Sequence, residues 1–180
     1  MTLTQQTPRQ QVLKLGSDCK RCGHCCSFGS AFVLPEEIES IAKHLKISPE
    51  KFKEKYLDKA ERFNTKLYRF KTKKKKDKPY GPCIFLKFNK TCKIHDAKPL
   101  FCRIGTCKEH GGEAIQWYDL NHNVNTEDPQ SIREWAIFVN QKDPIPGGKL
   151  EDLIPDKKTL KKILEYDDLR IKKPEADQNG

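Results

Sequence analysis

The sequence predicts an α+β protein: a small cysteine-cluster metal-binding domain with a helical hairpin and short β-strands, followed by a mostly helical C-terminal extension. Three observations lead to this prediction. All eight cysteines lie before residue 108, in two separate groups. Apolar residues at helical spacing follow the first group and recur after residue 128. Short alternating stretches, separated by Gly-containing turns, surround the second group and are typical of strands.

The composition limits the class of protein. Of the 180 residues 36% are hydrophobic, and the mean hydropathy is −0.81, so the apolar core is expected to be modest. No apolar run is long enough to span a membrane, and the first 15 residues lack the features of a secretory signal. We therefore expect a cytoplasmic protein without membrane contact, in which thiols stay reduced unless they hold a metal or do redox work. Four disulfides, as in a small secreted protein, are the disfavoured alternative.

The elements of the first half follow from local patterns. Residues 1–14 are polar and are expected to be flexible. After the short strand SAFVL, Pro35 begins a helix with one apolar face. Ser48, Pro49 and Glu50 begin a second helix. Its apolar positions are Phe52, Tyr56, Leu57, Ala60 and Phe63.

The second half mixes strands and helices. LYRFK and CIFLKF are predicted strands on either side of a lysine-rich loop, and QWYDL is a further one. Asp128 and Pro129 begin a helix, and DKKTLKKILEYDD forms the last. We thus expect a flexible N-terminus at 1–14, a metal- or cluster-binding domain at 15–110, a C-terminal extension packed on it at 111–172, and a disordered tail at 173–180.

The cysteines carry the predicted chemistry. In CKRCGHCC, Cys19-x2-Cys22 has a spacing found in zinc knuckles and iron–sulfur loops alike, and Cys25 repeats it. Cys26 adjoins Cys25, and adjacent side chains are expected to point in different directions, which favours two metal positions or a multinuclear cluster. The second group supplies the remaining sulfurs: Cys83, Cys92, Cys102 and Cys107.

These residues resemble a known family. CKRCGHCC, the following FVLPEEIESIAKHLKISPEKFKEKYL and then GPCIFLKFNKTCKIHDAKPLFCR are similar to the YkgJ-like CxxCxxCC cysteine-cluster family of zinc- or iron-chelating domains, over about residues 16–104. The resemblance implies seven cluster residues: Cys19, Cys22, Cys25, Cys26, Cys83, Cys92 and Cys102. Cys107 is additional, and His95 stands where the family has Tyr. Whether either is a ligand stays open.

The sequence supports three hypotheses about function. The favoured one is a protein that holds an iron–sulfur cluster, such as 4Fe-4S, or two zinc or iron ions, with a redox or metal-handling role. Because the family is related to flagellin lysine N-methylase, a cluster-dependent enzyme acting on a protein substrate is the alternative. A structural zinc module that binds nucleic acid through basic residues 66–78 is the third.

Two other residues near the cysteines are candidates for a role at the site. His24, inside the motif, is read as a loop residue facing solvent, and Arg103 as a candidate partner of the cluster sulfurs. Catalytic residues, and whether there is catalysis at all, stay open.

Overall fold

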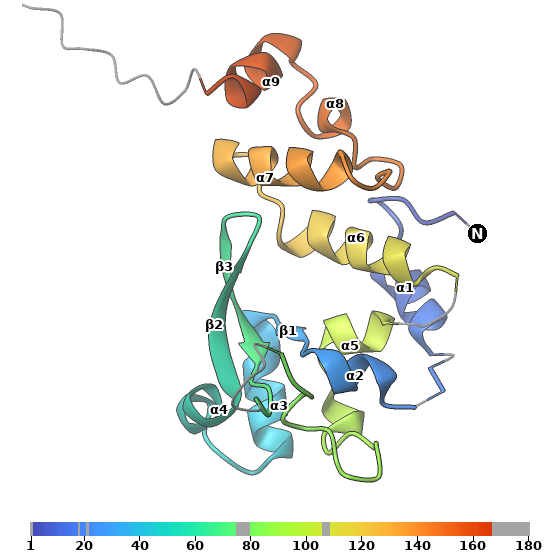
Figure 1. The fold of residues 1–180 in the computed structure, drawn as a ribbon, viewed down its shortest axis with the longest axis vertical. Coiled ribbons are helices and arrows are strands. Elements are labelled where there is room, and N and C mark those ends of the chain that lie inside the picture. Colours follow the sequence, from blue (N-terminus) through green and yellow to red (C-terminus); the bar gives the residue numbers. More distant parts are fainter. Residues whose placement is uncertain (1, 18, 21, 75–79, 106–108, 167–180) are drawn as a thin grey trace, which may run out of the picture.

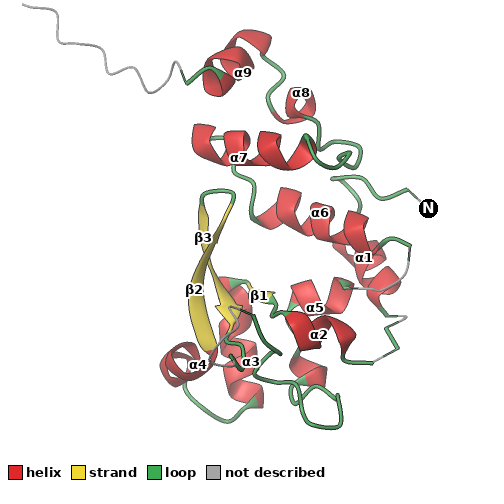
Figure 2. Cartoon of the chain, in the orientation of Figure 1, coloured by secondary structure: helices red, strands yellow, loops and turns green. Residues whose placement is uncertain are grey.

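The chain combines helices with one small sheet, which confirms the α+β class (Figures 1 and 2). The structure, a computed structural model, describes residues 2–17, 19–20, 22–74, 80–105 and 109–166. In chain order the elements of these residues are α1 (Arg9–Gly16), α2 (His24–Phe28), β1 (Phe32–Val33), η1 (Pro35–Glu37), α3 (Ile38–His44), α4 (Pro49–Tyr56), β2 (Leu57–Arg62), β3 (Thr65–Phe70), η2 (His95–Ala97), α5 (Leu100–Ile104), α6 (Gly111–His122), α7 (Pro129–Val139), α8 (Leu150–Leu153) and α9 (Lys157–Leu164).

The N-terminal segment is packed against the rest of the chain. Leu3 and Val12 are fully buried, and the indole Nε1 of Trp117 in α6 donates a 2.8 Å hydrogen bond to the carbonyl of Thr7. The expectation of a flexible segment at residues 1–14 does not match this packing. Their polar composition concealed the two apolar side chains that anchor the segment.

The helical hairpin of α3 and α4 agrees with the sequence prediction, except in its length. The hydroxyl of Ser48 accepts a 3.3 Å hydrogen bond from the backbone N–H of Lys51, and Pro49 begins α4. The helix ends at Tyr56, although apolar residues continue at helical spacing to Phe63. Leu57 has φ −114° and ψ 141°, because residues 57–62 pair as strand β2 along the whole of β3. Strand pairing with a distant segment overrides the local helical pattern.

The sheet is antiparallel, with β3 between β1 and β2. Phe63 and Asn64 both have positive φ, 50° and 54°, as a two-residue hairpin turn requires. Residues 67–70 of the predicted strand LYRFK belong to β3, and Lys71 follows its end. The predicted strand CIFLKF is wrong: it makes only isolated bridges, Thr72 with Cys83 and Leu86 with Cys92.

The described residues form two larger apolar cores. The first contains aromatic residues of the hairpin helices and their neighbours, such as Phe52, Phe70 and Phe85. The second contains Trp117 and Trp135 and the buried N-terminal residues. Phe101 in α5 packs against both cores. A third, smaller cluster joins α7 to α9.

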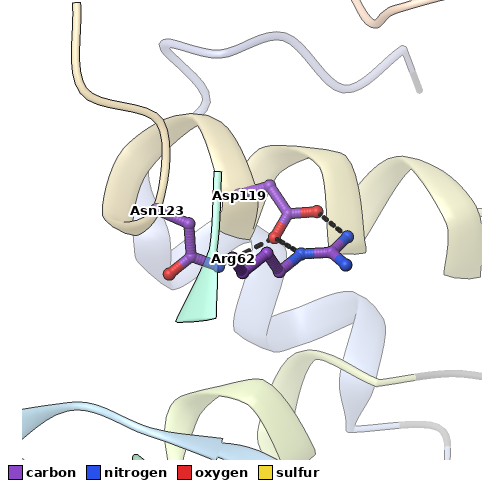
Figure 3. Close-up of polar contacts among 3 residues, drawn as sticks. All are labelled: Arg62, Asp119 and Asn123. Atoms are coloured by element: carbon purple, nitrogen blue, oxygen red, sulfur yellow. Dashed lines mark hydrogen bonds and ion pairs between the residues drawn. The ribbon is translucent and has the colours of Figure 1, made fainter. Parts of the chain in front are cut away.

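An ion pair links the β2–β3 hairpin to α6. The guanidinium of Arg62 at the end of β2 donates two hydrogen bonds, of 2.7 and 2.5 Å, to the carboxylate of Asp119 (Figure 3). Asp119 is fully buried and also accepts a hydrogen bond from the amide of Asn123. At the turn of the hairpin, the N–H of Asn64 donates to a carboxylate oxygen of Glu134 in α7. The hairpin therefore docks on the C-terminal helices.

The C-terminal part is helical. QWYDL, predicted as a strand, lies inside α6, where Trp117, Tyr118 and Leu120 are buried. No helix of the part of the chain that the structure describes is long and apolar enough to cross a membrane. The boundary near residue 110 stays a prediction, and the predicted tail at 173–180 lies outside the described residues.

Candidate metal centre

Seven cysteines line a single cavity of about 420 Å³. They come from three segments of the chain: the motif before and within α2, the segment between β3 and η2, and α5. The cysteines are Cys19, Cys22, Cys25, Cys26, Cys83, Cys92 and Cys102. Cys107 lies outside the described residues. The structure thus brings together every cysteine of the resemblance.

The motif is held in place by a left-handed glycine. Gly23 precedes α2 with φ 70°, and a Cβ at this position would lie 2.6 Å from the carbonyl oxygen of Lys90. Only a residue without a side chain lets the motif approach the 86–92 turn so closely. The hydroxyl of Ser27 donates a 2.8 Å hydrogen bond to the carbonyl of Gly23, which closes the turn of α2.

Main-chain hydrogen bonds place the cysteine-containing segments. The N–H of Cys83 donates a 2.7 Å hydrogen bond to the carbonyl of Cys26. Cys92 is placed by its bridge with Leu86, and the N–H of Cys102 donates to the carbonyl of Pro99 in the first turn of α5. Cysteines far apart in sequence therefore face one cavity through ordinary main-chain geometry.

The adjacent pair lies closer together than expected. The Sγ atoms of Cys25 and Cys26 are 3.8 Å apart, and both residues line the same cavity. A tetrahedral zinc ion with Zn–S bonds of about 2.3 Å holds two thiolates roughly 3.8 Å apart. Adjacency therefore does not force the two sulfurs onto separate metals, and our expectation that they point in different directions is not met.

Burial and interactions among the thiols shift their pKa values. The pKa of Cys25 is lowered to about 6, first by a hydrogen bond from the Cys26 thiol and in opposition to the effect of burial. The same hydrogen bond, with burial, raises the pKa of Cys26. Burial raises the pKa of Cys83 to about 11 and also raises those of Cys92 and Cys102. Nearby thiolates add to the increase in each of these last three cases.

The donor set fits a soft or borderline metal. Thiolates are the ligands of zinc and of iron–sulfur clusters, and binding a cation would release the protons that burial retains. Within the described ranges, however, no three His, Cys, Asp or Glu side chains are already arranged to hold one ion.

The cavity wall also contains residues that the sequence analysis missed. Phe70, Phe85, Ile94 and Phe101 give it an apolar lining. Phe101 adjoins Cys102 and Phe85 lies two residues after Cys83, but nothing local distinguishes them from ordinary core residues. An apolar wall limits water around the sulfurs and therefore affects the redox potential of a bound centre.

The other candidate residues have different positions. His95 lines the cavity, whereas His24 is exposed and packs its ring edge-on against Phe28. Arg103 lines a neighbouring open groove instead of the cysteine cavity. This polar groove, of about 940 Å³, shares Cys19, His95, Lys98 and Pro99 with the cavity. Sequence reasoning missed the groove because its residues come from separate segments.

The basic segment 66–78 is only partly a loop. Its first five residues belong to β3, where Lys66 pairs with Glu61 and Arg69 with Asp58. The ammonium of Lys71 donates to the carbonyl of Glu54. Opposite charges across the strands therefore offset part of the positive charge. Residues 75–79 lie outside the described residues.

A cavity lined by seven cysteines in a small α+β fold defines the class of cysteine-cluster metal-binding proteins. In agreement with this, the CxxCxxCC family, described as a "Putative zinc- or iron-chelating domain", matches residues 18–130, and the chain belongs to this family. No solved structure matches the chain.

Proposed function

We propose that the cavity holds an iron–sulfur cluster, or two zinc or iron ions, and that the protein has a redox or metal-handling role in the cytoplasm. The observation that carries this proposal is the convergence of seven cysteines on one cavity. One tetrahedral ion needs four sulfur ligands, so seven exceed the requirement of a single structural zinc. The apolar wall formed by Phe70, Phe85 and Phe101 supports an iron–sulfur cluster, whose potential depends on exclusion of water.

The seven cysteines would be the ligands of the bound centre. Cys25 and Cys26 in α2, with Cys83 opposite them, would form one side of the ligand set. Cys92 and Cys102 would provide further ligands, and Cys19 and the exposed Cys22 would complete the set. A bound centre would supply electron transfer or metal exchange. The protein supplies the sulfur ligands and the apolar surroundings. The positive charge of Lys98, which also lines the cavity, favours the thiolates of Cys25 and Cys92, although burial raises the pKa of Cys92 overall.

A specific observation supports the enzyme alternative as well. The polar groove adjoins the cavity through Cys19 and His95 and is large enough for a small polar substrate. A cluster-dependent reaction such as lysine methylation would need such a space beside the metal. A methyl donor that leaves the visible spectrum of the loaded protein unchanged at millimolar concentration would count against this alternative.

The structural-zinc alternative has less support. Two cations of the segment that it requires, Lys66 and Arg69, lie opposite acidic residues of β2. Binding to nucleic acid would have to weaken steeply with salt, with a log–log slope of about one for each phosphate neutralised.

The deciding experiment is the metal and acid-labile sulfide content of protein purified without oxygen, with its visible spectrum. Iron and sulfide in about equal amounts are expected for an iron–sulfur cluster. Colourless protein with two zinc ions would support the zinc form of the proposal. Protein that binds neither metal after anaerobic reconstitution would overturn the proposal.

A further inference from the structure

The cysteine cavity has cationic residues and no carboxylates in its wall. Lys20, Lys90 and Lys98 line it, and no Asp or Glu of the described residues does. The sequence shows why: neither residues 19–34 nor residues 80–95, which provide most of the wall, contain an acidic residue. These two segments carry five Lys or Arg residues. The two segments that provide most of the wall are therefore basic, and the carboxylates of Glu36, Glu37 and Asp96 lie in the neighbouring groove.

Two exposed aromatic side chains adjoin this cavity. Phe28 is 64% exposed and precedes Gly29, which lines the wall. Phe88 is fully exposed and stands between two lining residues, Leu86 and Lys90. Exposed aromatic side chains with charged residues nearby in the chain, such as Lys87 and Lys90 beside Phe88, are typical of interaction sites.

The turn that carries Phe88 is held by several hydrogen bonds. The N–H of Lys87 donates 2.8 Å to the carbonyl of Thr91, and the side-chain oxygen of Asn89 accepts from the hydroxyl of Thr91 at 2.7 Å. From outside the turn, the ammonium of Lys73 donates 2.6 Å to the carbonyl of Leu86. Phe88 is therefore presented by an ordered turn, at little entropic cost to binding.

We propose that this surface binds an acidic segment of a partner protein, which sits over the opening of the cysteine cavity. Phe28 and Phe88 provide apolar contacts, and Lys20, Lys87 and Lys90 pair with carboxylates of the partner. The proposal rests on the proposed function, because a protein that delivers or receives a metal ion or an electron must reach this cavity.

A protein partner fits better than nucleic acid or a membrane. Nucleic acid needs a basic track along several phosphates, but Lys66 and Arg69 of the basic segment lie opposite Glu61 and Asp58 across the strands. Aromatic contacts surrounded by charged residues have the composition of a protein interface. The positive charge would also accelerate the approach of an acidic partner at low salt.

The test measures binding of a fluorescent peptide that alternates Glu and Asp with two Leu residues, using the full chain. In Lys20→Glu/Lys87→Glu, affinity is expected to fall by about ten-fold or more, and in Phe88→Ser by several-fold. The matched controls are Lys157→Glu/Lys158→Glu, which makes the same charge change on exposed residues of α9, and Ile137→Ser, at a side chain that is 60% exposed in α7. Both are expected to bind within about two-fold of the unmodified protein.

Two further probes distinguish the other partners. A single-stranded oligonucleotide and vesicles with an anionic lipid are titrated against the same variants. The proposal is overturned if the control variants weaken peptide binding equally, or if either probe binds more tightly than the peptide with the same dependence on Lys20, Lys87 and Phe88. Metal content is measured in each variant. Loss of peptide binding with unchanged metal content supports the docking surface, whereas absence of metal from the unmodified protein after anaerobic reconstitution refutes the proposed function separately.

Discussion

Cys25 and Cys26 illustrate how neighbouring side chains determine the chemistry of a thiol. The two sulfurs lie 3.8 Å apart, and a hydrogen bond from Cys26 makes Cys25 the more acidic. Cys83 and Cys102 are buried deeper, and burial raises the pKa of both. The thiols of one cavity therefore differ strongly in how readily they ionise, although the sequence presents them as equivalent.

The first prediction concerns the reactivity of Cys25 in metal-free protein. Its folded pKa of about 6 lies below the usual 9.0, so its thiolate should form as the pH rises through 6. Because this pKa is lower in the folded than in the unfolded protein, the Cys25 thiolate stabilises the metal-free fold above pH 9. This stabilisation is lost as the pH falls through about 6. Alkylation by iodoacetamide at pH 7, followed by mass spectrometry, should modify Cys25 much faster than Cys102. In Cys26→Ala the preference should largely disappear, and equal rates in the unmodified protein would contradict the assignment.

The second prediction separates ligand loss from loss of packing. Cys22 is exposed, whereas Cys83 is 7% exposed in the core. Cys22→Ser should lower metal content and the melting temperature of the loaded protein but leave the metal-free melt unchanged. Cys83→Ser should lower both melts, because it also places a hydroxyl in an apolar site, at a cost of about 1–3 kcal/mol. Metal analysis with thermal melts of both forms tests this, and full metal content in both variants would show that the site is misassigned.

Among the elements, the position of α2 depends on a single backbone conformation. Gly23 allows the helix to begin against the 86–92 turn, and α2 then places two cysteines in its first turn. Strand β2, in contrast, depends on pairing with another segment of the chain. Residues 57–62 become β2 because β3 is available to pair with them, not because of their own composition.

The third prediction follows from Gly23. Gly23→Ala should destabilise the protein by about 1–3 kcal/mol, because Ala disfavours positive φ and its Cβ would meet the carbonyl of Lys90. Gly29→Ala is the matched control: φ there is −168°, and a Cβ would have no neighbour within 4 Å. Denaturant unfolding of both variants measures the difference. Similar stabilities would contradict the assigned role of Gly23.

In the molecule as a whole, the β2–β3 hairpin joins the cysteine-containing part of the chain to the C-terminal helices. Arg62 on β2 neutralises Asp119, which has no exposure to solvent. Arg62 also lies over the ring of Phe63, so its side chain contacts both the ion partner and an aromatic residue of the second core. The metal-binding half and the C-terminal half are thus connected by a buried charge (Figure 3).

The fourth prediction tests this connection. Arg62→Met should destabilise the protein by about 3–5 kcal/mol, because it leaves the buried carboxylate of Asp119 without its cation. Adding Asp119→Leu should recover much of the loss. Glu165→Gln is the control, because its 3.8 Å pair with Lys161 is exposed and worth less than about 1 kcal/mol. Chemical denaturation measures all four proteins, and an equal effect of Arg62→Met and Glu165→Gln would refute the connecting role.

Local sequence patterns predicted several elements well. The apolar face of α3, the cap and Pro49 of α4, and Asp128 with Pro129 before α7 are short-range signals with a direct physical cause. The seven cysteines that line the cavity are those that the family resemblance implied, and their role as ligands stays a prediction. QWYDL was misread because a short run of large apolar residues suits a strand or a buried helix equally.

Family membership, the α+β class and the group of seven cysteines follow from the amino-acid order, because each depends on residue identity and short-range spacing. The common cavity, the 3.8 Å approach of Cys25 and Cys26, and the pairing of residues 57–62 with β3 depend on segments that are distant along the chain. So do the burial of Leu3 and the surroundings of Asp119. Such contacts become favourable only when the chain closes long loops and buries apolar surface together, which no local pattern records.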